Sequence, residues 1–146
     1  MRISAWNPSG VATPSGNYSQ LVRVETGDAA FLFISGQVAK AADGKIVGEG
    51  NLEQQAERVF SALTTILEEN GTDWSGVVRL GTYLVDGVDV DDFRRVRDRY
   101  LSSPPPASTL VFVPRLIADH WLLEVDAVAV VETSRDVTPQ STAPLR

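Results

Sequence analysis

Apolar residues recur every three to four positions between Leu52 and Asn70, which is the spacing of a helix with one buried stripe. Asn51 precedes the stripe and can cap the first turn, and Asn70 followed by Gly71 is a typical C-terminal stop. The pattern therefore predicts one long amphipathic helix near the middle of the chain. Its apolar positions are Leu52, Ala56, Val59, Phe60, Leu63, Ile66 and Leu67.

A second helix is predicted from Asp89 to Leu101, where apolar positions share one face and acidic residues fill the first turn. Three consecutive prolines from Pro104 end it, because proline lacks the helical amide and disfavours a helical residue before it. Five further segments are β-branched or alternate between apolar and polar residues, and turn residues bound them, so they are predicted strands. These segments are Gln20–Val24, Phe31–Ile34, Val77–Val85, Ser108–Val113 and Leu122–Val131.

The last predicted strand has two different faces. Glu124 and Asp126 lie among apolar residues on one face, so we expect this face to meet something other than open water. Acids on an otherwise apolar sheet face indicate a subunit interface with a site in it. The other face is wholly apolar and is expected to lie under the helices; it consists of Leu123, Val125, Ala127, Ala129 and Val131.

The order of these elements is β-β-α-β-α-β-β, which predicts an α+β fold with one mixed sheet and both helices on one of its faces. We expect residues 1–133 to form a single domain, because 146 residues is an ordinary domain length and the chain has no internal repeat. Residues 134–146 are polar and aperiodic, so a disordered tail is expected there.

Composition and charge narrow the classes of function. The chain has no cysteine, which excludes disulfides, thiolate metal sites and a cysteine nucleophile. Its formal net charge is −6, and the basic run from Arg94 to Arg99 is interleaved with acids. We interpret that run as a solvated helix face rather than a nucleic-acid site. No apolar run has the length of a signal peptide or a membrane span, which predicts a cytoplasmic protein with no membrane partner.

Six short segments resemble one known family, in the same order along the chain. The resemblance is to the reactive-intermediate deaminase (Rid, or YjgF) family, and it runs from about Tyr18 to Val131. It implies a chorismate-mutase-like fold, a homotrimer whose sheets line a central barrel, and three clefts between adjacent subunits. It also implies hydrolysis of enamines and imines derived from amino acids, without metal or cofactor. The segments are Asn17–Gln20, Ile34–Gln37, Leu52–Ala56, Asp92–Val96, Pro106–Thr109 and Leu123–Val130.

The resemblance implies a set of cleft residues. Tyr18 and Glu124, which match the family's tyrosine and its water-holding glutamate, are the candidate catalytic residues. Desolvation in a partly apolar cleft would raise the pKa of Glu124, which suits a general acid or base. The structural alternatives are an interface glutamate satisfied by amides, an aromatic at the core edge and a turn glycine. The candidate substrate-binding residues are Gly36, Ser108, Thr109 and Arg97.

Ser108 departs from the family pattern, which has an arginine directly after Pro-Ala to clamp the substrate carboxylate. A serine hydroxyl cannot neutralise a carboxylate, and losing a charge-assisted pair costs about 1.5–3 kcal/mol. Turnover of the usual 2-imino acids is therefore in doubt. Arg97 could return the missing charge, although a pair with Asp92 or Asp98 is the preferred interpretation. Arg115 is an unsuitable substitute, because an unbroken strand would point it to the opposite face.

Two classes of function remain open. The preferred one is a cofactor-free hydrolase, deaminase or tautomerase acting on an imine or enamine other than the usual 2-imino acids. The alternative is a non-catalytic small-molecule-binding or regulatory trimer that kept the cleft and lost the chemistry. A ribonuclease fits poorly, because the chain is acidic and has one histidine, His120, which also argues against a serine–histidine pair or a histidine metal site.

Overall fold

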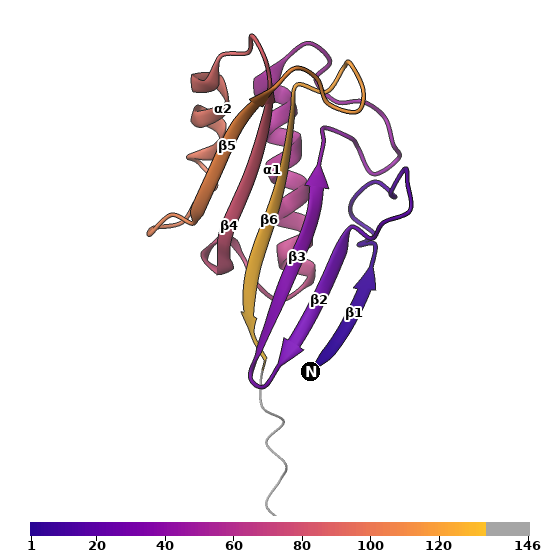
Figure 1. Ribbon diagram of the computed structural model, residues 1–146, viewed down its shortest axis with the longest axis vertical. Coiled ribbons are helices and arrows are strands. Elements are labelled where there is room, and N and C mark those ends of the chain that lie inside the picture. Colours follow the sequence, from indigo (N-terminus) through magenta and orange to yellow (C-terminus); the bar gives the residue numbers. More distant parts are fainter. Residues whose placement is uncertain (134–146) are drawn as a thin grey trace, which may run out of the picture.

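Figure 1 shows the strands as one twisted sheet with both helices behind it. The computed structural model describes residues 1–133; the predicted disordered tail lies outside the described residues. The helices are α1 (Leu52–Glu69) and α2 (Val90–Arg97), and a short 3₁₀ turn, η1, spans Trp74–Gly76. The strands are β1 (Arg2–Trp6), β2 (Leu21–Thr26), β3 (Ala29–Gln37), β4 (Val77–Val85), β5 (Ala107–Val113) and β6 (Leu123–Glu132).

The sheet has the order β1-β2-β3-β6-β4-β5, with β4 and β5 parallel and every other neighbouring pair antiparallel. The predicted α+β fold, with a mixed sheet and both helices on one face, is confirmed. The predicted order lacked β1. This edge strand pairs with β2 but buries none of its five residues, so no hydrophobic pattern marks it in the sequence.

The core lies between the sheet and α1, as the pattern predicts. The apolar face of β6 is buried, with Leu123, Val125 and Ala129 fully so, and Phe60 of α1 is fully buried as well. Burying one such large apolar side chain contributes about 1.5–3 kcal/mol. This packing fixes one face of β6 against the helix and leaves the other face of the same strand open.

The second helix ends at Arg97 rather than at the predicted Leu101. The next residues continue as tight turns, in which the Arg99 amide donates to the Val96 carbonyl (3.1 Å) and the Tyr100 amide to the Arg97 carbonyl (3.0 Å). Such three-residue spacing is a common way to satisfy the last carbonyls of a helix. In the described part of the chain neither helix is both long and apolar enough to cross a membrane.

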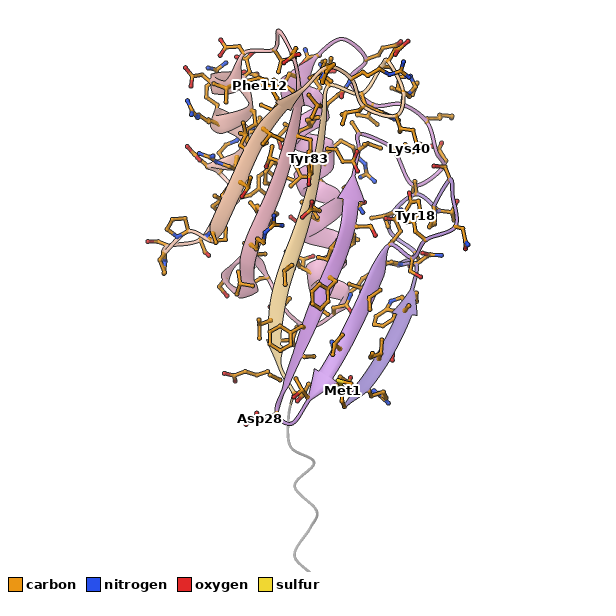
Figure 2. The ribbon with its side chains drawn as sticks, viewed as in Figure 1. Met1, Tyr18, Asp28, Lys40, Tyr83 and Phe112 are labelled. Atoms are coloured by element: carbon orange, nitrogen blue, oxygen red, sulfur yellow. The ribbon has the colours of Figure 1, made fainter. Side chains whose placement is uncertain are left out.

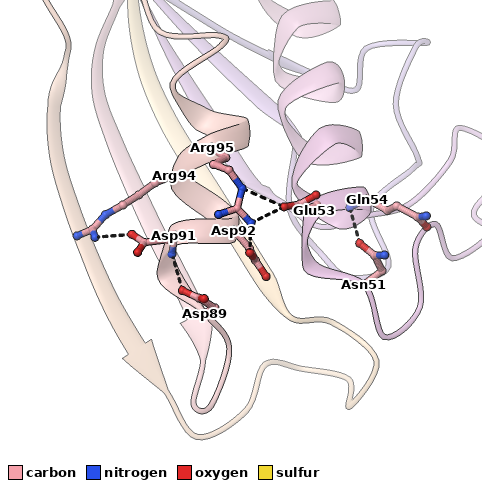
Figure 3. Close-up of polar contacts among 8 residues, drawn as sticks. All are labelled: Asn51, Glu53, Gln54, Asp89, Asp91, Asp92, Arg94 and Arg95. Carbon is pink, nitrogen blue, oxygen red and sulfur yellow. Dashed lines mark hydrogen bonds and ion pairs between the residues drawn. The ribbon is translucent and has the colours of Figure 1, made fainter.

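The charged face of the helices is held by ion pairs, which Figure 3 shows in close-up. Arg94 contacts Asp91 at 3.0 Å, and Arg95 contacts both Asp92 and Glu53 of α1, the latter at 2.7 Å. These side chains are largely solvent-exposed, so each pair adds little stability. Arg94 and Arg95 thus lie on a solvated helix face, as predicted for the basic run, and both are paired with acids.

A fully buried glutamine, Gln55, connects α1 to two loops. Its side-chain amide donates to the carbonyl oxygens of His120 (2.8 Å) and Gly48 (3.2 Å). Its carbonyl oxygen accepts from the amide of Leu122 (2.9 Å), one residue before β6 begins. Because buried backbone groups need partners, this side chain helps to fix where β6 starts, together with the pairing of β6 with β3 and β4.

Candidate functional site

The open face of β6 carries two acids, each packed over a glycine of a neighbouring strand. Glu124 lies over Gly36, which falls in the irregular stretch of β3 between Ile34 and Gln37. A Cβ at position 36 would collide with the Glu124 carboxyl group, and one at position 81 would lie 2.6 Å from a carboxylate oxygen of Asp126. Glycine at these two positions provides the room in which the acids lie against the sheet.

Glu124 opens into a cleft of about 330 Å³. Most of its lining comes from the segment between β1 and β2, the end of β3 with the residues after it, and the loop before β6. Ala62 of α1 and Glu124 of β6 complete it. The cleft brings together Tyr18, Gly36 and Glu124, which are three of the predicted site residues. Tyr18 is 48% exposed, so its ring is available to a ligand.

A pair of buried glutamines holds the wall that carries Tyr18. The Gln37 side-chain amide donates to the Gln20 side-chain oxygen at 2.8 Å, and the Gln20 amide donates to the carbonyl of Ala12 at 2.9 Å. The Ser35 hydroxyl donates to the carbonyl of Ser19, also at short range (2.7 Å). These bonds tie the segment before β2 to the end of β3, so Tyr18 is held next to Gly36 by a satisfied polar network.

Burial raises the pKa of Glu124, and repulsion from the nearby Asp126 carboxylate raises it further. Asp126 itself is paired with Arg79 of β4 (3.1 Å). Among residues 1–133 no hydrogen-bond donor reaches the Glu124 carboxylate, so within one chain the structural alternative of a carboxylate satisfied by amides does not describe it. A carboxyl group with a raised pKa, open to a cleft, is suited to accept and return a proton.

The raised pKa of Glu124 makes the stability of the fold depend on pH in a definite direction. Folding favours the protonated form. The contribution of Glu124 to the free energy of unfolding is therefore fully present at pH values below the pKa that it has in the unfolded chain. The contribution is lost as the pH rises through the higher pKa of the folded state, because ionisation is then more costly in the folded chain. Glu124 therefore opposes folding when ionised, as expected for a group placed for chemistry rather than stability.

Ser108 and Thr109 lie on β5, at the opposite edge of the sheet from the cleft, and neither lines it. Ser108 pairs with Leu80, which is fully buried on the helix side, so the Ser108 side chain belongs to the face opposite Glu124. Thr109 pairs with Gly81, which pairs with Asp126, so it shares the face of Glu124 but lies two strands away. Figure 2 shows the separation between Tyr18 and Phe112, which is on β5.

Arg97 also lies away from the cleft, at the end of α2. Its guanidinium group pairs with Asp98 (2.7 Å) and lies 5.8 Å from the centre of the Phe93 ring. The preferred interpretation, a pair with Asp92 or Asp98, is confirmed. Within one chain, the structure thus brings together Tyr18, Gly36 and Glu124 and leaves Arg97 with the β5 residues at the far edge.

The cleft also contains residues that sequence reasoning missed. Lys40, Ile117 and Trp121 line it, together with the buried pair Gln20 and Gln37. Gln37 is a polar residue at the end of a largely apolar strand, and this pattern could have predicted a site residue. No local sequence pattern predicts that Lys40 lies in the cleft. Within the described residues, no cluster of histidine and acidic side chains is arranged to hold a metal ion.

Comparison with known proteins places this geometry in a family. The family model described as Endoribonuclease L-PSP matches residues 10–131. A RutC family protein from Synechocystis is 36% identical over 122 residues, covering 82% of this chain and 90% of that protein. A 2-iminobutanoate/2-iminopropanoate deaminase from Dermatophagoides farinae is 27% identical over 119 residues, covering 82% and 89%.

Solved structures agree with the sequence comparisons. The crystal structure of RidA from the Antarctic bacterium Psychrobacter superimposes with a TM-score of 0.75 at 26% identity, covering 88% of this chain and 99% of that one. The matched region includes the cleft segments around Tyr18, Gly36 and Glu124. The chain therefore belongs to the Endoribonuclease L-PSP family, which is the Rid, or YjgF, family that its sequence resembles.

Proposed function

We propose that this protein hydrolyses a small imine or enamine in its cleft without a cofactor, and that the substrate is not one of the usual 2-imino acids. The observation that carries the proposal is the Glu124 carboxyl group, which has a raised pKa and opens into the cleft beside Tyr18. The similarity to a protein named as an imino-acid deaminase supports a reaction at a C=N bond.

The proposed reaction is a hydrolysis in which Glu124 moves protons. Glu124 takes a proton from a water molecule as the water oxygen forms a bond to the imine carbon, and the proton then goes to the nitrogen. The hydroxyl proton of the resulting carbinolamine then passes through Glu124 to the same nitrogen as the C–N bond breaks and the carbonyl forms, which releases ammonia or an amine. An enamine first gains a proton at its β-carbon and loses its N–H proton, which gives the imine. Tyr18 and the backbone at Gly36 orient the polar end of the substrate. Proton transfer of this kind typically contributes 10²–10⁴-fold to a rate.

We also propose a homotrimer, in which a neighbouring subunit completes each cleft. Within one chain Ser108 and Glu124 lie on opposite faces of the sheet, so only another chain can bring β5 and α2 to the cleft. Large apolar side chains remain exposed on the face that Glu124 shares, which supports a covered surface. These side chains are Phe31 (37% exposed), Phe33 (48%), Tyr83 (36%) and Val111 (40%).

The purified protein is expected to be a trimer of about 47 kDa, which is three times the 15.8 kDa of one chain. The reason is that the apolar face of the sheet, with its two acids, is more stable when neighbours cover it. Light scattering coupled to size exclusion measures the mass directly. A monomer at micromolar concentration would rule out a cleft shared between subunits.

Ser108 predicts little or no hydrolysis of 2-aminoacrylate, because a serine cannot neutralise the carboxylate that the family arginine clamps. Semicarbazide trapping of the imine should give rates close to the uncatalysed background for the wild type. Ser108→Arg is expected to raise the rate, and Ser103→Arg, at an exposed serine before β5, is the matched control. Wild-type turnover as fast as that of arginine-bearing relatives would show that this interpretation of Ser108 is wrong.

Glu124→Gln is expected to leave the trimer intact and to lower turnover of the true substrate by about 10²-fold or more, because the amide cannot exchange the proton. Initial rates over a panel of unstable imines would measure the loss. The control is Glu132→Gln, at an exposed glutamate at the end of the same strand, which should keep wild-type rates.

Unchanged turnover in Glu124→Gln would make Glu124 structural. The alternative, a non-catalytic binding or regulatory trimer, is favoured by one observation, the serine at position 108. It predicts a different result: no imine is turned over by the wild type, and Glu124→Gln changes ligand affinity instead.

A further inference from the structure

The cleft contains a cation as well as an acid. Lys40 lines the same cavity as Tyr18 and Glu124. Figure 2 shows Lys40 and Tyr18 on the same side of the molecule, to the right of the end of β3. Among the described residues that line the cavity, two are charged, Lys40 and Glu124. Lys40 is therefore the cation of the cavity within residues 1–133.

The backbone of Lys40 is held firmly, whereas its ammonium group has no acidic partner in residues 1–133. The Lys40 carbonyl accepts from the Arg58 side chain (2.6 Å), its amide donates to the Val38 carbonyl (2.7 Å), and it pairs with Ile46 across an isolated bridge. No described ion pair includes Lys40. Lys45, the other lysine of the chain, pairs with Asp43 (3.2 Å).

Lys40 is a half-buried residue, and a lysine that lines a cavity without an acidic partner in residues 1–133 is suited to an anionic ligand. Lysine is a point charge on a flexible four-carbon stem, so it can reach an oxyanion without the fixed geometry that an arginine fork requires. Lys40 and Glu124 line the same cavity, but no ion pair joins them within the described residues. The cleft therefore presents a cation that pairs with no acidic side chain of residues 1–133, which leaves it available to an anionic ligand.

We propose that Lys40 binds an oxyanion of the substrate, either a carboxylate or a phosphate. This inference rests on the proposed function, because it takes the ligand of the cleft to be the imine or enamine that is hydrolysed. It makes the substrate class an anionic imine or enamine, held from the wall at the end of β3. The anion is thus bound from a different side than the β5 position of Ser108, so Lys40 selects an anionic group placed elsewhere on the substrate than the carboxylate of the usual 2-imino acids.

The test is a binding titration followed by ¹⁵N–¹H NMR, with ligands that resemble a hydrolysis product. The probes are 4-oxopentanoate, its neutral methyl ester and inorganic phosphate. We expect the wild type to bind at least one anion, and Lys40→Met to weaken that binding by about tenfold or more, as for loss of a charge-assisted contact. The methyl ester should bind both proteins equally, and Lys40→Arg should restore anion binding. Which anion loses affinity in Lys40→Met identifies the carboxylate or the phosphate.

Lys45→Met is the matched control, because Lys45 is an exposed lysine five residues away that does not line the cleft. Equal anion affinities in Lys40→Met and the wild type would overturn the proposal. It would also be overturned if neither anion bound the wild type, or if Lys40→Met dissociated the oligomer, since Lys40 would then pair with another subunit. The proposed function fails separately: normal turnover in Glu124→Gln would remove the hydrolase while leaving the anion site in place.

Discussion

The carboxyl group of Glu124 occupies space that any side chain at position 36 would take, and this constraint links the fold to the site. Glycine in β3 lets the carboxyl lie against the sheet, where burial and Asp126 raise its pKa. The other face of β6 is packed under α1, so the strand cannot turn and carry the acid away from the cleft. Gln55 helps to fix where the strand begins. Together these contacts hold one ionisable group in one place.

The same arrangement explains why one chain holds only part of the site. The cleft side of the sheet contributes Glu124, Tyr18 and, as we infer, the cation Lys40. The β5 edge presents Ser108 on the opposite face, so its residues can act only toward a neighbour. In a trimer each subunit would supply one wall from its cleft side and another from its β5 edge. Moving the cation from the β5 edge to the end of β3 would change which anionic substrates fit, without changing the proton chemistry.

Local pattern was enough to predict much of this structure. The apolar stripe of α1 and the two faces of β6 follow directly from residue spacing, and Glu124 could be placed on the open face before any contact was known. Three features could not be predicted. β1 buries nothing and is held by pairing alone. The face on which Ser108 lies depends on the register between β4 and β5. The Lys40 position depends on turns that bring residues 11–20 and 35–40 together, which are contacts between distant segments.

The central claim is that the cleft holds Glu124 with a raised pKa, and that Asp126 is part of the cause. The most direct measurement is the pH titration of the Glu124 side-chain carboxyl carbon by ¹³C NMR, in the wild type and in Asp126→Asn. The account predicts a pKa above that of an exposed glutamate in the wild type. It predicts a lower pKa in Asp126→Asn, because the variant removes a repelling charge and frees Arg79 from its partner. A wild-type pKa at or below that of an exposed glutamate would contradict the account.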